Sequence, residues 1–514
     1  MHADERFNLG RWPQLHVRWR PEQVALCEGE TRRTYRELAA RVDRLGAALQ
    51  ANGVQFGDRV ALLLPNRVET VELILACARI GAIAVPLNFR LVARELAFML
   101  RDSGARLLFW DAGFQALAEG LKSEALPPEL RWVELDAELE TFVQRAADAA
   151  AGPARPSQPV SENTPHLIMY TAGTTGLPKG VVLTHGNTFW QTMNAVNLGI
   201  MPGVVGLATL PLFHVGGLNG SVLPLLFIGG TVVIQRQFAP LETLALIRAH
   251  KVQGMVGVPA MFQMMAAMPT FGSADLSSVI AFTSGGAPLP LHTIEVYRAR
   301  GIVFRQGYGL TEAAPGVTGM EPQDAFLKPG SVGRPCHHTE VRVVNELDED
   351  CAPGVSGEVI VRGPNIMPEY WNRPAESAEA LRGGWLRTGD AGHFDADGYL
   401  FVAGRIKEMI ITGGENLYPA EVVNALSEHP AVADAAVIGM PDEKWGQRPV
   451  AFIVGWPGKA VDAAALGAHL EGRLARYKHP REYHFVAMLP RNATGKVVRQ
   501  KLVDLLEPPE GASR

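Results

Sequence analysis

The sequence predicts an α/β fold, with a large N-terminal region of parallel-rich sheets layered with helices and a small α/β domain after it. Strands and helices alternate over roughly the first 300 residues, an order that is typical of βαβ units and a mostly parallel sheet. The chain has 514 residues, a length that suggests about three domains or one large domain with smaller ones. About the last 110 residues have the size of a separate domain.

The first predicted helix begins at Thr34. The stretch from Thr34 to Glu37 matches a capping box, and apolar residues follow at helical spacing. Gly53 supplies the expected C-terminal stop. The next expected elements are a buried strand over 59–64, a helix over 69–80 and a strand over 82–85.

A linker or surface loop is expected over 150–165, which is rich in Pro, Ser and Ala. Strands and helices alternate again from Leu167 to about Phe304. The strands expected after that lie near 340–345, 357–362 and 399–402. The elements expected in the C-terminal unit are strands near 435–438 and 450–454 and a helix over 463–474.

The composition is that of a folded globular protein. Hydrophobic residues make up 47% and charged residues 20%, which excludes a disordered chain, and the 53 Gly follow no collagen-like period. The formal net charge of −5 argues against a general nucleic-acid binder. Four Cys without a C-x-x-C pair argue against a disulfide scaffold or a cysteine-rich zinc site. The N-terminus lacks the apolar stretch of a signal peptide, so we expect a cytoplasmic protein.

One long stretch, 180–235, contains no Lys, Arg, Asp or Glu. A run of about 20 apolar residues would indicate a membrane span. Asn187, Pro202, His214 and other polar or helix-breaking residues interrupt every window of about 18 residues here. We therefore expect elements buried on both faces of a parallel sheet, and no transmembrane segment.

The most informative segment, 170–180, follows an apolar strand. Gly173 and Gly176 allow backbone N–H groups to approach an anion, and Lys179 adds a compact positive charge for phosphate oxygens. The hydroxyl donors are those of Thr171, Thr174 and Thr175. The segment is not a Walker A loop, because Pro precedes the Lys and Gly follows it. A surface turn rich in Gly and Thr is the alternative interpretation.

This segment closely resembles the signature loop of the adenylate-forming superfamily, which comprises acyl-CoA synthetases, firefly-type luciferases and the adenylation domains of peptide synthetases. The loop of that family usually has Ser where this chain has Ala172, so we expect weaker or rearranged phosphate contacts at most. The family's other motifs are matched, in the same order, at 284–289, 306–312, 385–390, 404–409, 410–422 and 490–496. The resemblance extends from about Thr34 to about Leu502, and the conjunction of the motifs carries it.

The resemblance implies an enzyme that uses ATP, Mg²⁺ and CoA. It would convert a carboxylic acid to an acyl adenylate, release pyrophosphate, and transfer the acyl group to CoA as a thioester. The resemblance also implies an N-terminal AMP-binding domain over 1–404 and a mobile C-terminal domain over 405–514, with Lys407 as the hinge. The first step brings several negative oxygens together, so it needs positioning and charge neutralisation more than a strong base.

The catalytic roles fall, by the same resemblance, to Lys496, Thr311, Glu312 and His214. Lys496 would contact the acid carboxylate and the α-phosphate, and Thr311 would donate to a phosphate. Glu312 is a hard oxygen ligand suited to Mg²⁺, and Thr171 is the second residue expected at the metal. Each has an ordinary alternative: most Lys are merely solvated, and His214 fits a buried structural role equally well.

The nucleotide and the thiol are expected at the remaining motifs. Tyr308 would offer a flat face to the purine, and Asp390 would accept from both ribose hydroxyls. Arg405 would hold the ribose or a phosphate. The other residues expected at ATP or CoA are Ser284, Gly285, Gly286, Ala287, Gln306, Gly307, Gly309, Gly413, Gly414, Glu415 and Trp445. Further candidates for the nucleotide end of CoA are Tyr477, Arg90, His479 and Arg481.

The acid pocket is expected beside His214, in the stretch without charges. Its other expected wall residues are Trp190, Val215, Val258, Met261, Ser284, Ala313 and Ala314. These residues carry no charge, so a second carboxylate or an α-amino group is poorly served. A medium- or long-chain fatty acid or an aryl acid fits better. The absence of Asp from 180–235 disfavours amino acids, because peptide synthetases typically place an Asp in this region.

Two other functions are left open by the sequence. A freestanding adenylating enzyme that loads a carrier-protein thiol would keep the same motifs. A catalytically silent nucleotide-binding protein is disfavoured, since all the catalytic residues are present. We expect small-molecule partners and no nucleic acid, and the sequence allows a homodimer. The run from Cys336 to His338 lacks a full ligand set for zinc.

Overall fold

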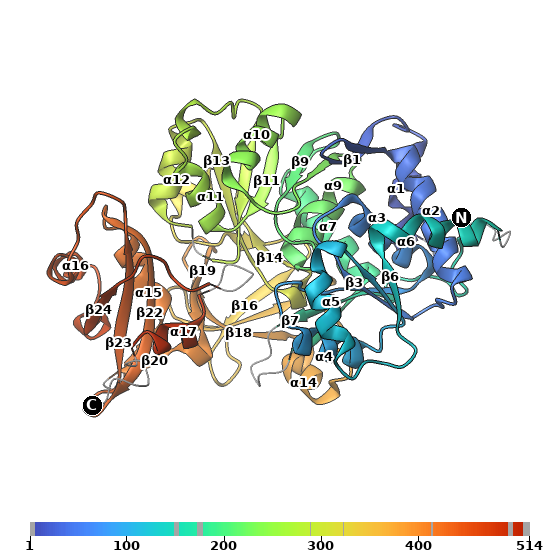
Figure 1. The fold of residues 1–514 in the computed structure, drawn as a ribbon. Coiled ribbons are helices and arrows are strands. Elements are labelled where there is room, and N and C mark those ends of the chain that lie inside the picture. The colour runs from blue at the N-terminus through green and yellow to red at the C-terminus, as the bar shows by residue number, and fades with distance from the viewer. Residues whose placement is uncertain are drawn as a thin grey trace, which may run out of the picture.

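The computed structural model describes residues 6–148, 154–171, 178–287, 289–321, 323–412, 415–491 and 497–506. These residues form four sheets with helices packed around them. Figure 1 shows the last part of the chain, in orange and red, lying to one side of a larger region formed by the rest. The α/β class and the division into large and small parts are as the sequence predicts.

A six-stranded sheet carries the predicted βαβ units. Its strands, in spatial order, are β6 (Arg131–Glu134), β5 (Leu107–Trp110), β3 (Arg59–Leu63), β4 (Ile83–Pro86), β7 (Pro165–Thr171) and β8 (Lys179–Thr184). The first five are parallel, and β8 is antiparallel to β7. The helices that follow the predicted pattern are α2 (Tyr35–Ala51) and α3 (Val68–Ile80). The predicted capping box is confirmed: Thr34 accepts from the Glu37 backbone, and the Glu37 carboxylate accepts from the Thr34 N–H.

A nine-stranded sheet forms the second layer. Its strands, in spatial order, are β15 (Arg334–Pro335), β14 (Gly316–Gly319), β13 (Val303–Gly309), β12 (Ala281–Ser284), β11 (Gly254–Gly257), β9 (Val205–Ala208), β10 (Thr231–Ile234), β1 (Val24–Glu28) and β2 (Thr31–Thr34). The run from β13 to β1 is parallel, and the pairs at both edges are antiparallel. One face packs on α10 (Pro240–His250), α11 (Pro259–Ala266) and α12 (Leu291–Arg298).

A four-stranded sheet follows in the chain, and it is wholly antiparallel. Its strands, in spatial order, are β16 (Glu340–Val344), β17 (Gly357–Arg362), β18 (Leu386–Phe394) and β19 (Leu400–Arg405). All three strands predicted from the sequence are present. Parallel neighbours need a crossover of a dozen or more residues, whereas a short link such as that between β18 and β19 favours an antiparallel pair.

The small C-terminal part is built on a sheet of five strands. These are β20 (Ile410–Thr412), β21 (Glu415–Leu417), β22 (Val432–Asp442), β23 (Gly446–Gly455) and β24 (Glu482–Phe485), with α15 (Pro419–Ser427), α16 (Ala463–Leu470) and α17 (Arg499–Asp504). Both predicted strands are longer than expected. The predicted helix over 463–474 is four residues too long, because the chain is extended at Glu471 (ψ 131°) and Gly472 takes a positive φ of 74°. Gln263 of α11 donates to the Ala433 carbonyl at 3.2 Å, which joins the two parts.

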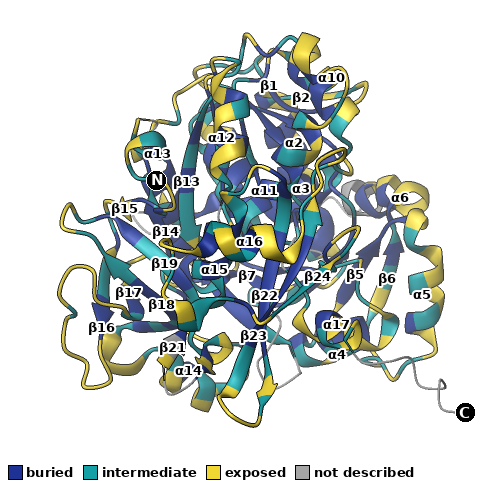
Figure 2. Ribbon diagram, turned by 90° about the vertical axis from the view of Figure 1, so that its left-hand side faces the viewer, coloured by how far each residue is buried: buried dark blue, intermediate teal, exposed yellow. Residues whose placement is uncertain are grey.

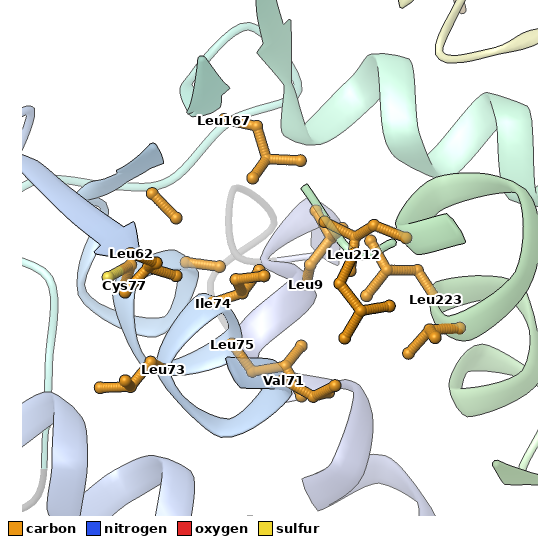
Figure 3. Packing of buried hydrophobic residues seen from close by; sticks show 14 of the residues in the cluster. Leu9, Leu62, Val71, Leu73, Ile74, Leu75, Cys77, Leu167, Leu212 and Leu223 are labelled. Atoms are coloured by element: carbon orange, nitrogen blue, oxygen red, sulfur yellow. The ribbon is translucent and has the colours of Figure 1, made fainter. Parts of the chain in front are cut away.

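The stretch without charges folds into buried elements, as predicted. It comprises β8, α7 (His185–Asn197), β9, α8 (Val215–Gly217), the π-helical turn η4 (Leu218–Val222), α9 (Leu223–Phe227) and β10. Figure 3 shows Leu212 and Leu223 from this stretch in one apolar cluster with Leu9 and with residues of α3. Figure 2 shows that the strands are mostly buried and that the outer helices, such as α5 and α12, carry more exposed residues. Within the described ranges, no helix is long and apolar enough to cross a membrane.

Candidate active site

Residues from three sheets meet where β7 and β13 end. Glu312 lies in the turn η6 (Thr311–Ala313), directly after β13. Lys179 begins β8 and pairs with Thr171 at the end of β7. Tyr370 joins the two, because its hydroxyl donates to Glu312 Oε1 at 2.8 Å and Lys179 Nζ lies 5.3 Å from its ring centroid. Burial raises the pKa of Tyr370, so its hydroxyl is a protonated donor at neutral pH.

The second group of polar residues joins β13 to the antiparallel sheet. Asp390 on β18 stands opposite Arg405 on β19, and Arg405 Nε lies 2.9 Å from Asp390 Oδ1. Tyr308 on β13 donates its hydroxyl to the other carboxylate oxygen, Oδ2. Burial raises the pKa of Tyr308. Asp390 is buried, and each of its two carboxylate oxygens has a partner at the edge of the site.

The placement of Tyr308 refines its predicted role. Its hydroxyl is engaged with Asp390, so the side chain is fixed at both ends by packing and by hydrogen bonding. It links the expected purine site to the expected ribose site, rather than serving as a flat face alone.

The turn after β13 is held by side chains that the sequence motifs do not include. Asn365 donates to the carbonyls of Ala313 and Gly316, each at 2.8 Å. Gln191 accepts from the Gly316 N–H at 3.0 Å. Thr311 is buried in the same turn. Ala313 and Ala314, which were expected in the pocket wall, are fully buried in the main apolar cluster.

The expected adenine-side turn, 284–287, leaves β12 beside β13. Ser284 and Gln306 stand opposite each other on these two strands. Both are buried, and the Ser284 hydroxyl and the Gln306 amide nitrogen have no hydrogen-bond partner in the described part of the chain. Gly286 takes a positive φ of 81°, which favours glycine. Two unsatisfied polar atoms at the carboxyl ends of parallel strands indicate a ligand site.

Two glycines of the next motif have steric reasons to be glycine. A Cβ at Gly309 would lie 2.0 Å from the Pro315 carbonyl oxygen. A Cβ at Gly307 would lie 3.1 Å from the Thr318 oxygen, and Gly285 would approach the Gly307 oxygen at 3.4 Å. The backbone is therefore closely packed around these positions, and a side chain at Gly309 would collide with the neighbouring backbone.

The remaining residues expected to line the acid pocket come from α7, from the segment around α8 and from the start of α11. His214 precedes α8 and accepts from the Gly216 N–H through Nδ1 at 3.2 Å. Val215 and Met261 are buried, and Val258 is half-buried. Trp190 of α7 is half-buried, with its ring centroid 5.0 Å from that of His338.

The residues expected at CoA lie mainly on the small part. Trp445 is partly exposed in the link between β22 and β23, and the Arg481 guanidinium lies 5.4 Å from its ring centroid. Tyr477 and His479 follow α16 in and after the turn η9 (Arg476–Lys478). Lys407 and Glu415 are exposed residues of the small part, and Arg90 is an exposed residue that follows β4 in the large part.

Some expected site residues lie outside the described residues. These are Gly173, Thr174, Thr175, Gly176, Gly413, Gly414 and Lys496. Among the residues that are described, no group of three or more His, Cys, Asp or Glu could hold a metal ion. The Glu312 carboxylate nevertheless fits Mg²⁺, which is usually bound by one or two carboxylates together with substrate phosphates and water.

The chain matches two family models along most of its length. Residues 14–371 match the AMP-binding enzyme model, and residues 421–496 match the AMP-binding enzyme C-terminal domain. The chain belongs to the AMP-binding enzyme family. This is the adenylate-forming superfamily that the motifs resemble, and the family assignment made from the sequence is confirmed.

Relatives and solved structures match over nearly the full length. The chain is 42% identical to a feruloyl-CoA synthase of Amycolatopsis sp, covering 96% of this chain and 97% of the relative. It is 41% identical to an indoleacetate–CoA ligase of Aromatoleum aromaticum (97% and 98%) and 37% identical to a fatty acid–[acyl-carrier-protein] ligase of Streptomyces coeruleorubidus (98% and 97%). The o-succinylbenzoate coenzyme A synthetase of Bacillus subtilis, solved with ATP and magnesium, is 34% identical with a TM-score of 0.83 (96% and 99%).

These findings make the protein an AMP-forming acid–CoA ligase that uses ATP, Mg²⁺ and CoA. The sequence missed Tyr370, Asn365 and Gln191, which hold Glu312 and its turn in place. No motif contains them. Their roles depend on contacts between residues 58, 52 and 125 positions apart, respectively, which no local pattern reveals.

Proposed function

We propose that this ligase activates an aryl acid or a medium- to long-chain fatty acid, and that the residues named above carry out the reaction. The observation that carries the proposal is the wall of the expected pocket. Val215 lies in a stretch without a single Lys, Arg, Asp or Glu, and the buried Met261 adds a second uncharged side chain to the expected wall. Relatives named for feruloyl, indoleacetate and fatty acid substrates support the same classes.

In the adenylation step the protein positions two anions against each other. Lys179 and Lys496 would neutralise phosphate and carboxylate oxygens, and Thr311 would donate to a phosphate. Glu312, with Thr171 as the second expected ligand, would hold Mg²⁺, which supplies further neutralisation of the phosphates. Tyr370 would fix the orientation of the Glu312 carboxylate through its hydrogen bond. Closure around the reacting groups would exclude water and strengthen each of these interactions.

The nucleotide would lie along β12, β13 and β18. The Ser284 hydroxyl and the Gln306 amide, which lack partners among the described residues, would bind the base side. Asp390 would accept from the ribose hydroxyls, held in place by Tyr308 and Arg405. The backbone around Gly285, Gly286, Ala287, Gly307 and Gly309 would pass close to the ligand.

The thioester step would use the small domain in a second orientation. We propose a boundary between 404 and 405, with Lys407 as the hinge. The exposed position of Lys407 in the single turn η8 (Ile406–Glu408) supports this, since hinges are a few residues at the ends of elements. The loop with Gly413, Gly414 and Glu415 would line the thiol path, and Trp445, Tyr477, Arg90, His479 and Arg481 would meet the nucleotide end of CoA. His214 would adjoin the acyl group.

The test is pyrophosphate release with CoA across straight-chain, branched and aromatic acids. We expect release with apolar or aryl acids and none with amino acids. A companion variant, Lys496→Ala, should abolish ATP–pyrophosphate exchange while sparing thioester formation from a supplied acyl adenylate. An unchanged exchange rate in that variant would remove Lys496 from the mechanism.

A carrier-protein thiol is the second candidate acceptor of the acyl group, and one observation favours it. The relative from Streptomyces coeruleorubidus is named for loading an acyl-carrier protein. Supplying free CoA or a holo-carrier protein to the same adenylate distinguishes the two thiols. A homodimer and a cytoplasmic location also belong to the proposal, and are tested by sedimentation and by cell fractionation.

A further inference from the structure

Three half-buried residues form a row across neighbouring strands of the large sheet. Val256 on β11 pairs with Thr283 on β12, and Thr283 pairs with Arg305 on β13. Each stands on the face opposite to the apolar cluster, since the residues just before them, such as Phe282 and Phe304, are fully buried in that cluster. The row therefore lies on a partly open face of the sheet.

Arg305 is the charged member of this row, and it forms no ion pair with a carboxylate of the described residues. Its Nε is buried without a hydrogen-bond partner, and no ion pair joins Arg305 to any residue of the described ranges. Burial lowers the pKa of Arg305, and Glu321 is the carboxylate that partly opposes this effect. In contrast, the buried Arg67 meets Asp111 at 2.7 Å and Asp136 at 2.8 Å. A buried donor without a partner is costly, and a ligand oxygen would satisfy the Nε of this half-buried side chain.

Arg305 lies behind the reacting centre on the pocket side. It precedes Gly309 by four residues of β13, which at about 3.3 Å per residue places it roughly 13 Å from the end of the strand. Its guanidinium reaches the exposed turn just after α7, because a Cβ at Gly199 would lie 3.0 Å from Arg305 Nη2. The same helix carries Trp190, an expected wall residue. Arg305 thus extends from β13 toward the C-terminal end of α7, away from the catalytic groups.

We propose that Arg305 determines substrate specificity by binding an oxygen acceptor at the far end of the acid, remote from the carboxyl group that is activated. The inference rests on the proposed function and narrows it. The substrate class is an acid with an apolar body, such as one aromatic ring on a short linker, that ends in a carboxylate or a phenolic oxygen. A guanidinium suits either group, since it offers several donors in a planar fork. This proposal departs from the expectation from sequence that a second carboxylate is poorly served, and the acids compared below distinguish the two.

The test compares four acids that differ only at the para position: cinnamic acid and its 4-methyl, 4-hydroxy and 4-carboxy derivatives. In the unaltered enzyme, kcat/KM for pyrophosphate release should be at least tenfold higher for the oxygen-bearing acids than for the 4-methyl acid. Arg305→Met should remove that tenfold preference while kcat/KM for the 4-methyl acid stays equal or rises. Arg305→Lys should retain part of it, since the charge remains but the fork is lost.

The matched control is Arg248→Met, an exposed position on α10 across the same sheet, which should leave all four values unchanged. Equal loss for all four acids in Arg305→Met, or an unchanged preference, would overturn the specificity role. If Arg305→Met fails to fold, Arg305→Lys decides: a preference as large as in the unaltered enzyme overturns the role. Failure of the proposed function is a different result, namely no pyrophosphate release from any acid in the unaltered enzyme.

Discussion

Replacing Tyr370 by Phe tests whether the Glu312 carboxylate must be oriented by a neighbour. The change removes one hydroxyl, which donates to Glu312 Oε1 at 2.8 Å, and keeps the ring that lies beneath Lys179 Nζ. The carboxylate keeps its charge and its place in the turn η6. It loses only the contact that fixes its rotation.

The structure gives the size of the effect. A hydrogen bond to a charged group contributes about 1.5–3 kcal/mol. Glu312 is half-buried, so water can replace part of the lost bond, and the lower end of that range applies. A cost of about 1.4 kcal/mol is a tenfold change in rate. We therefore expect kcat/KM for ATP to fall about tenfold.

The assay is ATP–pyrophosphate exchange at a series of Mg²⁺ concentrations. Tyr370→Phe should require more Mg²⁺ for half-maximal exchange, because the carboxylate that holds the ion is less well oriented. Tyr297→Phe is the matched control, since this buried hydroxyl donates to the Phe262 carbonyl at 2.9 Å, away from the site. The control should lose some stability and keep its Mg²⁺ dependence. An unchanged Mg²⁺ curve for Tyr370→Phe, at normal kcat/KM, would refute the positioning role.

Two further variants, Asp390→Asn and His185→Gln, probe ionisable side chains that are buried. Asp390→Asn keeps the shape of the side chain but removes the charge that meets Arg405 at 2.9 Å, so the KM for ATP should rise. The free energy of unfolding should fall by about 1–2 kcal/mol, and no more, because Arg405 is partly solvated. Urea unfolding measures the loss of stability, with Asp275→Asn in an exposed ion pair as the control. Equal small losses of unfolding free energy in the two variants would contradict the prediction. Burial lowers the pKa of His185 from its usual value of 6.5 to about 3. Between these two pH values the unfolded chain binds a proton at His185 and the folded chain does not. Stability should therefore fall as pH drops, by about 2 kcal/mol at pH 5 from this residue; His185→Gln should flatten the curve and the exposed His337→Gln should not, and parallel curves would disprove it.

Local signals in the sequence were sufficient for α2, α3, β3 and β4 of the first sheet, whereas β5 and β6 were not predicted. The capping box at Thr34 and the helical spacing after it fix α2 within the chain itself, without any distant partner. The uninterrupted apolar run from Val60 to Leu63 predicts a strand buried on both faces, and β3 is central in a parallel sheet.

The sequence motifs predict which residues belong to the candidate site, but they do not predict how these residues contact one another. The motifs named Tyr308, Asp390 and Arg405 individually. Their contact arises because β18 and β19 pair in antiparallel register and because β13 ends beside them. Register between strands that are distant in sequence is set by packing, so it cannot be obtained from a motif. The same holds for Arg305, which carries no motif signal and becomes notable only through its missing partners within the described residues.

The ion pair between Asp390 and Arg405 also limits where the proposed hinge can lie. Arg405 is the last residue of β19, and its guanidinium contacts both Asp390 and the Thr388 carbonyl, at 2.9 and 2.8 Å. A rotation that began before Arg405 would break the strand pairing and both contacts, in a region where Asp390 is buried. A rotation that begins after it keeps the strand pairing and both contacts, and turns the chain at the exposed Lys407. Arg405 would then keep its place at the nucleotide in both half-reactions. This moves the proposed boundary from 404/405 to the residues after Arg405, and only the residues beyond Lys407 would change their position.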